Sequence, residues 1–195
     1  MNIEIRKLTP DLAEDYACFF DTTPHNEECG GEKCYCVTWR SGGWSNEGGD
    51  HWFPTQEERR ARAVGFVKDG YIQGYLAYNG DRIVGFCNAN ADFQGGVDYL
   101  RNHFPIEEYR ADIKVKSIFC FVIAPEMQRK GIATLLVEKI CKDAAEDGLD
   151  FVEAYVTPDS NNAGAARGPL AMYEKCGFTK CAEREGHIVM RKALK

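Results

Sequence analysis

Apolar residues are continuous over residues 118–123, and after Gly131 they recur with helical spacing. A continuous run of this length indicates a central strand covered on both faces. Pro125 ends it, because proline cannot donate to a strand ladder. From residue 132 a single apolar stripe predicts an amphipathic helix that ends near Gly148, where a left-handed cap residue belongs. The stripe is formed by Ile132, Leu135, Leu136 and Ile140, and the polar side by Lys139, Lys142, Asp143, Glu146 and Asp147.

The first third of the chain predicts one strand and two helices. Alternating apolar residues indicate a half-buried strand over residues 2–7. Thr9 and Pro10 then begin a helix that runs to about residue 21, with Thr9 as its cap. Thr55 caps a second helix with an acidic first turn, which runs to about residue 69. We interpret the basic run that begins at Arg59 in this helix as a solvated face.

The rest of the chain predicts more strands and a fold class. Residues 71–78 and 82–89 are strands joined by a hairpin turn at Asn79-Gly80. Further strands are expected over residues 113–123, 151–156, 181–184 and 187–191, and helices over 95–104 and 168–176, the latter capped by Gly177. The order predicts an α/β (α+β) domain over residues 1–195. We expect a mixed, mostly antiparallel sheet of six or seven strands with helices on both faces.

An irregular stretch at about residues 22–54 interrupts this pattern. Loops of this length inside one domain are usually functional or disordered, and its aromatic residues argue against disorder. We interpret it as a lid and a wall of a substrate pocket, lined by Trp39, Trp44 and Trp52. It also contains His25, Cys29, Cys34 and Cys36, whose spacing does not match a standard zinc site, so we expect thiols and no metal.

Composition and charge exclude several classes of protein. The net charge of −6 argues against a general nucleic-acid binder and is compatible with a cationic substrate. No apolar run approaches the roughly 18 residues of a membrane span. The first ten residues lack the core of a signal peptide. We therefore expect a cytoplasmic protein that binds neither nucleic acid nor membrane, with reduced cysteines.

The junction between the central strand and its helix has the features of an anion site. The first N–H groups of a helix have no partner within it, and the helix dipole favours negative charge there. A strand that enters such a helix end through a glycine-containing turn typically binds phosphate. Gly131 permits close approach, Ala133 leaves room, and Arg129 and Lys130 add positive charge. An ordinary strand-to-helix turn with solvated basic residues remains the alternative, because such bends are weak signals alone.

Two motifs in this region resemble the GNAT family of acetyl-CoA-dependent N-acetyltransferases. Gln128, Gly131 and Ala133 match the family's Q/R-x-x-G-x-G/A signature, and Pro125 stands where the family often has proline. About 40 residues later, residues 168–178 (GPLAMYEKCGF) resemble its A-x-x-x-Y-E-K-x-G-F segment. The resemblance covers about residues 71–192 and implies the GNAT fold, in which the strands flanking the cofactor helix splay apart.

The resemblance also implies a cofactor site and candidate catalytic groups. Pantetheine would pair with the strand edge at Phe121, Val122 and Ile123, with the amide of Val122 or Ile123 stabilising the oxyanion. The pyrophosphate of acetyl-CoA would lie on the backbone of Gln128, Arg129, Lys130, Gly131, Ile132, Ala133 and Thr134. Tyr173 matches the family's general acid for the thiolate; a core aromatic is the alternative.

The general base and one cofactor contact are not settled by the motifs. Glu153 lies in an apolar strand, where a carboxylate can have a raised pKa and take a proton directly or through water, or can pair with a neighbour. Asp112, His51 and His103 are weaker candidates. The asparagine that the family often has seven residues before its tyrosine is Ala166 here, and Asn161 or Asn162 would have to substitute.

The resemblance predicts acetyl transfer to a primary amine of a small molecule, directly in a ternary complex. A protein or peptide acetyltransferase is the alternative within this chemistry. The alternative outside it is a non-catalytic module whose cysteine-rich segment binds metal or a partner. The family often forms homodimers, and the sequence fixes neither the oligomeric state nor the acceptor.

Overall fold

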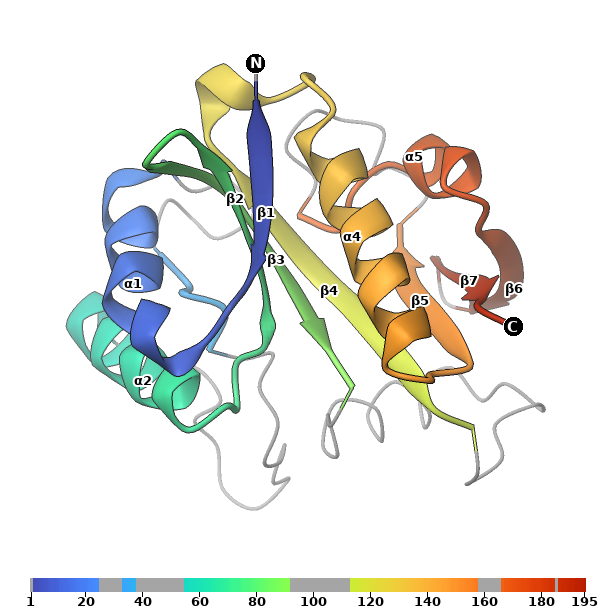
Figure 1. Cartoon of the computed structure of the whole chain (residues 1–195), viewed down its shortest axis with the longest axis horizontal. Helices are drawn as coiled ribbons and strands as arrows, with labels where there is room; N and C mark the ends of the chain where they lie inside the picture. The colour runs from blue at the N-terminus through green and yellow to red at the C-terminus, as the bar shows by residue number, and fades with distance from the viewer. Residues whose placement is uncertain (1, 25–32, 38–54, 92–112, 158–165, 185) are drawn as a thin grey trace.

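The computed structural model describes residues 2–24, 33–37, 55–91, 113–157, 166–184 and 186–195. Seven strands in these residues form one sheet in the order β1-β2-β3-β4-β5-β7-β6 (Figure 1). Paired neighbours are antiparallel except β4 and β5, which are parallel. The strands are β1 Ile3–Lys7, β2 Gly74–Asn79, β3 Arg82–Asn90, β4 Val115–Ile123, β5 Phe151–Val156, β6 Thr179–Arg184 and β7 His187–Ala193.

Helices cover both faces of the sheet, as predicted. Helices α1 (Ala13–Thr22) and α2 (Gln56–Lys68) pack beside each other on one face, and α4 (Ile132–Glu146) and α5 (Leu170–Lys175) lie on the other (Figure 1). On the first face, the Tyr16 ring meets that of Phe86 edge-on at 4.9 Å between centroids. On the second, Leu136 and Ile140 of α4 belong to one core cluster with Ala154 of β5. Each face of the sheet therefore has its own hydrophobic core.

Several local predictions are confirmed. Thr55 and Glu58 form a capping box at the start of α2. The turn at Gly80 joins β2 to β3 in an antiparallel pair. Gly148 and Gly177 have positive φ angles of 73° and 83° directly after α4 and α5. Element bounds differ by a few residues: β2 begins at residue 74, β4 at residue 115, and α5 covers only residues 170–175.

Two local expectations are wrong, and a third holds only in part. Thr9 is the N-cap residue and Pro10 follows it, as predicted, but the Thr9 side chain makes no capping hydrogen bond and the first turn, Pro10–Leu12, is a 3-10 turn before α1. Leu135 lies in the predicted apolar stripe but is 39% exposed. The Arg59 side chain is fully buried, and its Nε donates to the Lys33 carbonyl at 2.8 Å. That carbonyl is distant in sequence, so the charge pattern of α2 alone could not reveal it.

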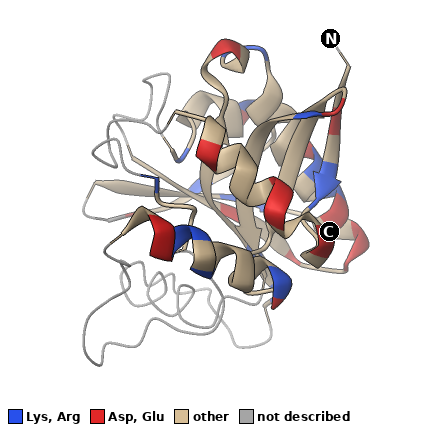
Figure 2. Cartoon of the chain, turned by 90° about the vertical axis from the view of Figure 1, so that its left-hand side faces the viewer, with Lys and Arg blue, Asp and Glu red and all other residues tan. Residues whose placement is uncertain are grey.

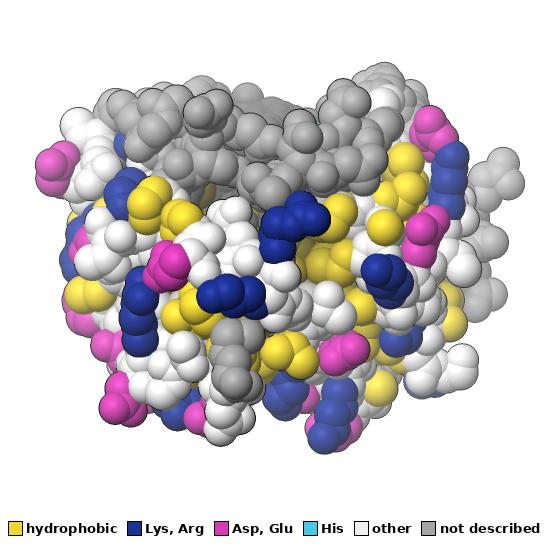
Figure 3. All heavy atoms as spheres, turned by 90° about the horizontal axis from the view of Figure 1, so that it is seen from above, with side chains coloured by type: hydrophobic (Ala, Val, Ile, Leu, Met, Phe, Trp, Pro, Cys, Tyr) yellow, Lys and Arg dark blue, Asp and Glu magenta, His cyan; other side chains and the backbone are white. Residues whose placement is uncertain are grey.

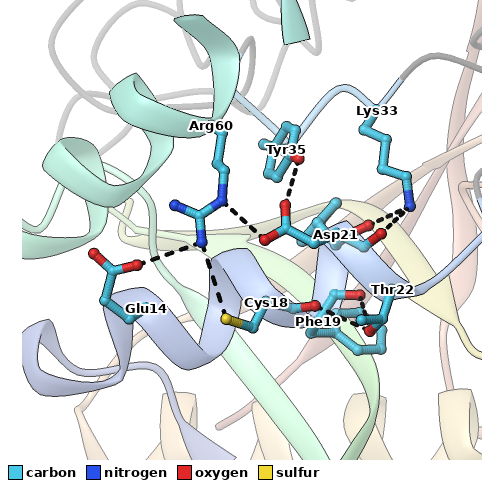
Figure 4. A network of polar contacts seen from close by, with 9 residues as sticks. Glu14, Cys18, Phe19, Asp21, Thr22, Lys33, Tyr35 and Arg60 are labelled. Carbon is cyan, nitrogen blue, oxygen red and sulfur yellow. Dashed lines mark hydrogen bonds and ion pairs between the residues drawn. The ribbon is translucent and has the colours of Figure 1, made fainter. Parts of the chain in front are cut away.

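Residues 33–37, the described part of the irregular stretch, are held against α1 (Figure 4). The Lys33 ammonium donates to the carbonyls of Phe20, Asp21 and Thr23 at 2.6–2.8 Å. These carbonyls lie at the end of α1, where backbone acceptors lack partners within the helix. The Tyr35 hydroxyl donates to an Asp21 carboxylate oxygen at 2.6 Å, and Tyr35 is fully buried. The segment is thus part of the core on the α1 side.

Acidic and basic side chains are interspersed on the side of the molecule that carries α1 and α2 (Figure 2). Arg60 of α2, for example, is paired with Asp21 of α1 at 2.9 Å and with Glu14 at 3.5 Å. None of the described helices has the length and hydropathy needed to cross a bilayer.

Candidate functional site

The parallel strands β4 and β5 separate halfway along their length. Their pairing begins at Val115 and Phe151 and ends at Ile118 and Ala154. The antiparallel pairing of β4 with β3 skips one residue at the same place, because Cys120 is opposite Asn88 whereas Ile118 is opposite Ala89. Phe119 is therefore the extra residue of a β-bulge, which bends the strand. The bulge accompanies a split that opens toward the end of β4.

The edge of β4 that borders the split presents the backbone of alternate residues. The Ala124 amide donates to the Val84 carbonyl at 3.0 Å, so even-numbered residues after the bulge face β3. The Phe121 amide instead donates to the Ala166 carbonyl at 2.5 Å, on the edge away from β3. Because strand groups alternate in direction, the Ile123 amide faces the split and the Val122 amide faces β3. Of the two predicted oxyanion donors, Ile123 has the better placed amide.

The turn after β4 has the geometry of an anion site. Arg129 and Gly131 have positive φ angles of 58° and 82°, and Lys130 between them does not. Such alternation turns successive N–H groups toward one point, forming a nest that favours anions. No side chain caps the first turn of α4, and that turn contains no acidic residue. The N–H groups over residues 131–134 can therefore bind a phosphate.

Basic and apolar side chains surround this end of the molecule. The view from above, onto the end at which α4 begins, shows Lys and Arg side chains beside a patch of hydrophobic side chains (Figure 3). The Gln128 amide group donates to the Ile123 carbonyl at 3.3 Å, which fixes the turn to the end of β4. A Cβ on Gly131 would meet no atom within 4 Å, so the space beside the nest is open.

Tyr173 lies in α5, which covers the same face of the sheet as α4 (Figure 1). Its side chain is fully buried, its ring meets Phe178 edge-on at 5.3 Å, and its hydroxyl donates to the Arg167 carbonyl at 2.9 Å. Burial raises the pKa of the Tyr173 phenol well above its usual value near 10. The phenol is therefore protonated at neutral pH, as a general acid requires. Its bond to Arg167 must be exchanged before that proton can reach a thiolate.

Glu153 lies in β5 and faces away from α4. Its side chain has no exposed surface. One carboxylate oxygen accepts from the Arg191 Nε at 2.6 Å, and the other accepts from the Tyr155 hydroxyl at 3.0 Å. Of the possibilities that the sequence left open, the structure contains the pairing with a neighbour. A direct contact between this carboxylate and an acceptor would need both bonds to be rearranged.

Several predicted residues fall outside the described part of the chain. These are the pocket residues Trp39, Trp44 and Trp52, the helix at 95–104, and His25, Cys29, His51, His103, Asp112, Asn161 and Asn162. Cys34 and Cys36 are described, and the Cys36 backbone N–H donates to the Cys34 sulfur at 3.5 Å. The nearby thiols of Cys120 and Cys34, together with burial, raise the pKa of the Cys36 thiol well above its usual value. Within the described residues, no group of three or more potential ligands is arranged to hold a metal ion.

Three residues of the candidate site were missed by sequence reasoning: Phe119, Ala166 and Tyr155. No glycine or proline near Phe119 indicates a β-bulge. The Ala166 carbonyl reaches β4 through a long-range contact. Tyr155 could have been found, because residues two apart in a strand share a face and Glu153 had already been selected.

Comparisons with known proteins agree with this geometry. A family model described as "Acetyltransferase (GNAT) family" matches residues 33–178. No curated protein sequence matches the chain.

Many solved structures share the fold. An acetyltransferase of the GNAT family from Streptococcus pneumoniae is 19% identical, with a TM-score of 0.54 over 100% of both chains. PaiA N-acetyltransferase from Thermoplasma acidophilum, solved in complex with coenzyme A, is 16% identical, with a TM-score of 0.54 over 99% of both chains. The ribosomal-protein-S18-alanine N-acetyltransferase from Escherichia coli is 14% identical, with a TM-score of 0.52 over 100% of this chain and 95% of that one. At these identities the likeness establishes the fold.

Proposed function

The chain belongs to the GNAT family of acetyltransferases, and we propose that it transfers the acetyl group of acetyl-CoA to a primary amine of a small molecule. The observation that carries the proposal is the combination of a split between β4 and β5 with an uncapped nest at the start of α4. The nest offers N–H donors to a pyrophosphate, and the split offers an edge of β4 to the pantetheine arm. The residues present therefore fit acetyl-CoA.

Acetyl-CoA would supply an activated thioester, and groups of the chain would bind its phosphates, stabilise the oxyanion and protonate the leaving thiolate. The Ile123 amide points into the split, where it can donate to the thioester oxygen as negative charge develops there. The backbone of residues 128–134 and the charges of Arg129 and Lys130 hold the phosphates. The Tyr173 phenol, buried in α5 and protonated at neutral pH, is the proposed donor to the leaving thiolate.

The Ala166–Arg167 segment accepts hydrogen bonds from two groups at this site. The Ala166 carbonyl accepts from the Phe121 amide, and the Arg167 carbonyl accepts from the Tyr173 hydroxyl. An arm that pairs with Phe121 must displace the first of these bonds. Ala166 stands where the family often has asparagine. Its backbone carbonyl forms the hydrogen bond to Phe121, whereas its methyl group cannot form the polar contact that an asparagine side chain would make with the cofactor.

A small amine is the acceptor class that the α1 side of the sheet supports best. Residues 35–37, within the irregular stretch, are buried in the core of this side together with Cys120 of β4. This burial supports a stretch that packs against the sheet beside the split, which suits a small acceptor better than an extended peptide. The net charge of −6 adds a modest attraction for a cationic amine.

A panel assay tests the proposal. The purified chain is incubated with acetyl-CoA and with polyamines, amino acids, aminoglycosides or peptides carrying a free amino terminus, and thiol release is measured. We expect release only with small amines. Tyr173→Phe should lower kcat on the order of 100-fold while the Kd for acetyl-CoA changes less than about twofold. Tyr75→Phe, a buried tyrosine under α4, is the control and should behave as wild type.

Two results would overturn the proposal. Thiol release with peptides and with no small amine would assign a protein substrate. Binding of acetyl-CoA without thiol release for any acceptor would assign a non-catalytic role to the domain.

A further inference from the structure

We propose that Tyr155 relays a proton from the acceptor amine to Glu153, an inference that rests on the proposed acetyl transfer. Tyr155 is the first residue of β5 beyond its last pair with β4, where Ala154 is opposite Ile118. The corresponding first residue on β4 is the bulged Phe119. The two rings stack at 5.9 Å between centroids with an interplanar angle of 19°. Tyr155 therefore lies at the apex of the split.

Tyr155 is buried, with 4% of its surface exposed, on the face of the sheet opposite the cofactor helix. Its neighbours Ala154 and Val156 belong to the core under α4, and alternate residues of a strand point to opposite faces. Tyr155 and Glu153 thus point to the face that carries α1 and α2. A cofactor whose phosphates lie at the start of α4 leaves this face for an approaching amine.

A chain of hydrogen bonds links the apex of the split to a buried charge. The Ser117 hydroxyl lies 3.1 Å from the Tyr155 hydroxyl, which in turn donates to Glu153 Oε2 at 3.0 Å. Glu153 Oε1 accepts from the Arg191 guanidinium at 2.6 Å, and that guanidinium packs over the Phe151 ring at 4.6 Å. The chain crosses three neighbouring strands, β4, β5 and β7.

This arrangement separates the carboxylate from the place where a proton is lost. Glu153 has no exposed surface, and each of its oxygens already accepts a hydrogen bond. Its hydrogen bond to the Tyr155 phenol therefore gives a proton a route from the apex of the split to the carboxylate. Replacing a buried ion pair by apolar residues is often neutral or stabilising. Stability alone therefore gives little reason for a Glu153–Arg191 pair beside the split.

The proton transfers balance in two steps. The bound ammonium gives one proton to the Tyr155 oxygen while the Tyr155 hydroxyl proton passes to Glu153, which leaves a neutral amine and a protonated carboxyl group. The amine then forms the amide bond to the acetyl carbon as the carbon–sulfur bond breaks. The Tyr173 phenol protonates the leaving thiolate, and the second proton of the amine replaces the one that Tyr173 gave up. Glu153 returns its proton to solvent through the same chain, so that one proton is released for each acetyl group transferred.

The test is a pH–rate profile of Tyr155→Phe with the best small amine from the panel. Between pH 6 and 9, the variant without the relay can use only amine that is already unprotonated in solution. At pH 7 its kcat/KM for the amine should therefore be on the order of 100-fold below that of wild type. The kcat/KM of the variant should then rise about tenfold for each pH unit until the pKa of the amine is reached. The profile of Tyr75→Phe should follow wild type at every pH.

Glu153→Gln in a double-mutant cycle sharpens the test. Groups that act as one relay are non-additive, so the double variant should lose no more than roughly twofold beyond Tyr155→Phe alone. Tyr155→Phe also removes a hydrogen bond from the buried Glu153 carboxylate, so its midpoint of thermal unfolding should fall below that of Tyr75→Phe. The Kd for acetyl-CoA should match between the two variants, and the pH dependence of kcat/KM separates a relay from a packing defect.

Each contrary result has a distinct meaning. A loss in Tyr155→Phe that is equal at every pH would assign a packing role and overturn the relay. Activity of Tyr155→Phe equal to that of Tyr75→Phe would also overturn it, while leaving the proposed acetyl transfer intact. A wild-type chain that acetylates no amine would overturn the proposed function first, and the relay with it.

Discussion

The left-handed conformation of Gly131 offers the sharpest test of the cofactor site. Its φ angle of 82° costs a residue with a side chain roughly 1–2 kcal/mol. A Cβ at this position would meet no atom within 4 Å, so the backbone conformation is the only local cost. If the turn relaxes when free, binding must restore the strained conformation. A cost of about 1–2 kcal/mol then raises the Kd for acetyl-CoA roughly 5- to 30-fold.

A graded series makes this argument quantitative. Asparagine adopts the left-handed region readily, alanine less so, and valine least because it is β-branched. Calorimetric titration with acetyl-CoA should therefore rank the Kd values as wild type, Gly131→Asn, Gly131→Ala and Gly131→Val, from tightest to weakest. Alanine should give the 5- to 30-fold increase, and valine more.

Gly148, at the other end of the same helix, is the matched control. Its φ angle is 73°, and a Cβ there would also meet no atom within 4 Å. Gly148→Ala and Gly148→Val should lower the melting temperature, by about 2–8 °C for alanine, and leave the Kd for acetyl-CoA unchanged. If Gly131→Val binds acetyl-CoA within twofold of Gly148→Val, the nest does not hold the cofactor and the reasoning is refuted.

Three further predictions concern stability. Gly168 has a φ angle of 75°, and a Cβ there would lie 2.9 Å from Met172 Cε, the flexible end of that side chain. Gly168→Ala should therefore destabilise by roughly 1–2 kcal/mol, mostly through backbone strain and about as much as Gly177→Ala; an unchanged urea midpoint for Gly168→Ala would contradict this. Arg59→Met should lower the free energy of unfolding by about 2–4 kcal/mol, because it removes the buried hydrogen bond to the Lys33 carbonyl. Arg60→Met, in a partly exposed ion pair, should lower it by at most about 1 kcal/mol. Equal losses for the two variants in urea denaturation would contradict this role of Arg59. Burial raises the pKa of the Cys141 thiol to about 11 from an ordinary value near 9. The thiol therefore ionises earlier in the unfolded chain, and the free energy of unfolding should fall by about 2 kcal/mol between pH 9 and 11; Cys141→Ala should flatten that decline in urea titrations at both pH values, and an unchanged slope would refute the assignment.

Elements defined by short-range signals could be predicted from the sequence. The turn at Gly80 and the capping box at Thr55 each depend on residues within a few positions of one another. The helix from Ile132 was predicted from its apolar stripe, with its end marked by Gly148. In these cases the chemistry that forms the element lies within the element.

The errors and omissions have long-range causes. Arg59 belongs to a charged run, but the carbonyl that it binds lies 26 residues earlier at Lys33. Leu135 fits the apolar stripe of α4 and still lies beyond the edge of the core. The register skip at Phe119 arises from pairing between β3 and β4, which no local pattern encodes.

The candidate site divides in the same way. An anion site at the start of α4 was predicted because Gly131 and its neighbours are contiguous, whereas the positive φ angle of Arg129 came only from the structure. The Arg191 partner of Glu153 lies 38 residues away, on a strand whose place beside β5 only the sheet order reveals. Choosing between the Val122 and Ile123 amides likewise required the register with β3.

Hydrogen–deuterium exchange with and without acetyl-CoA tests the central claim that the split between β4 and β5 holds the cofactor. The account predicts that added protection is concentrated in peptides covering residues 121–134, together with changed exchange around residues 166–173, where the bond between Ala166 and Phe121 is displaced. Protection confined to other parts of the chain, with unchanged exchange over residues 121–134, would contradict the account.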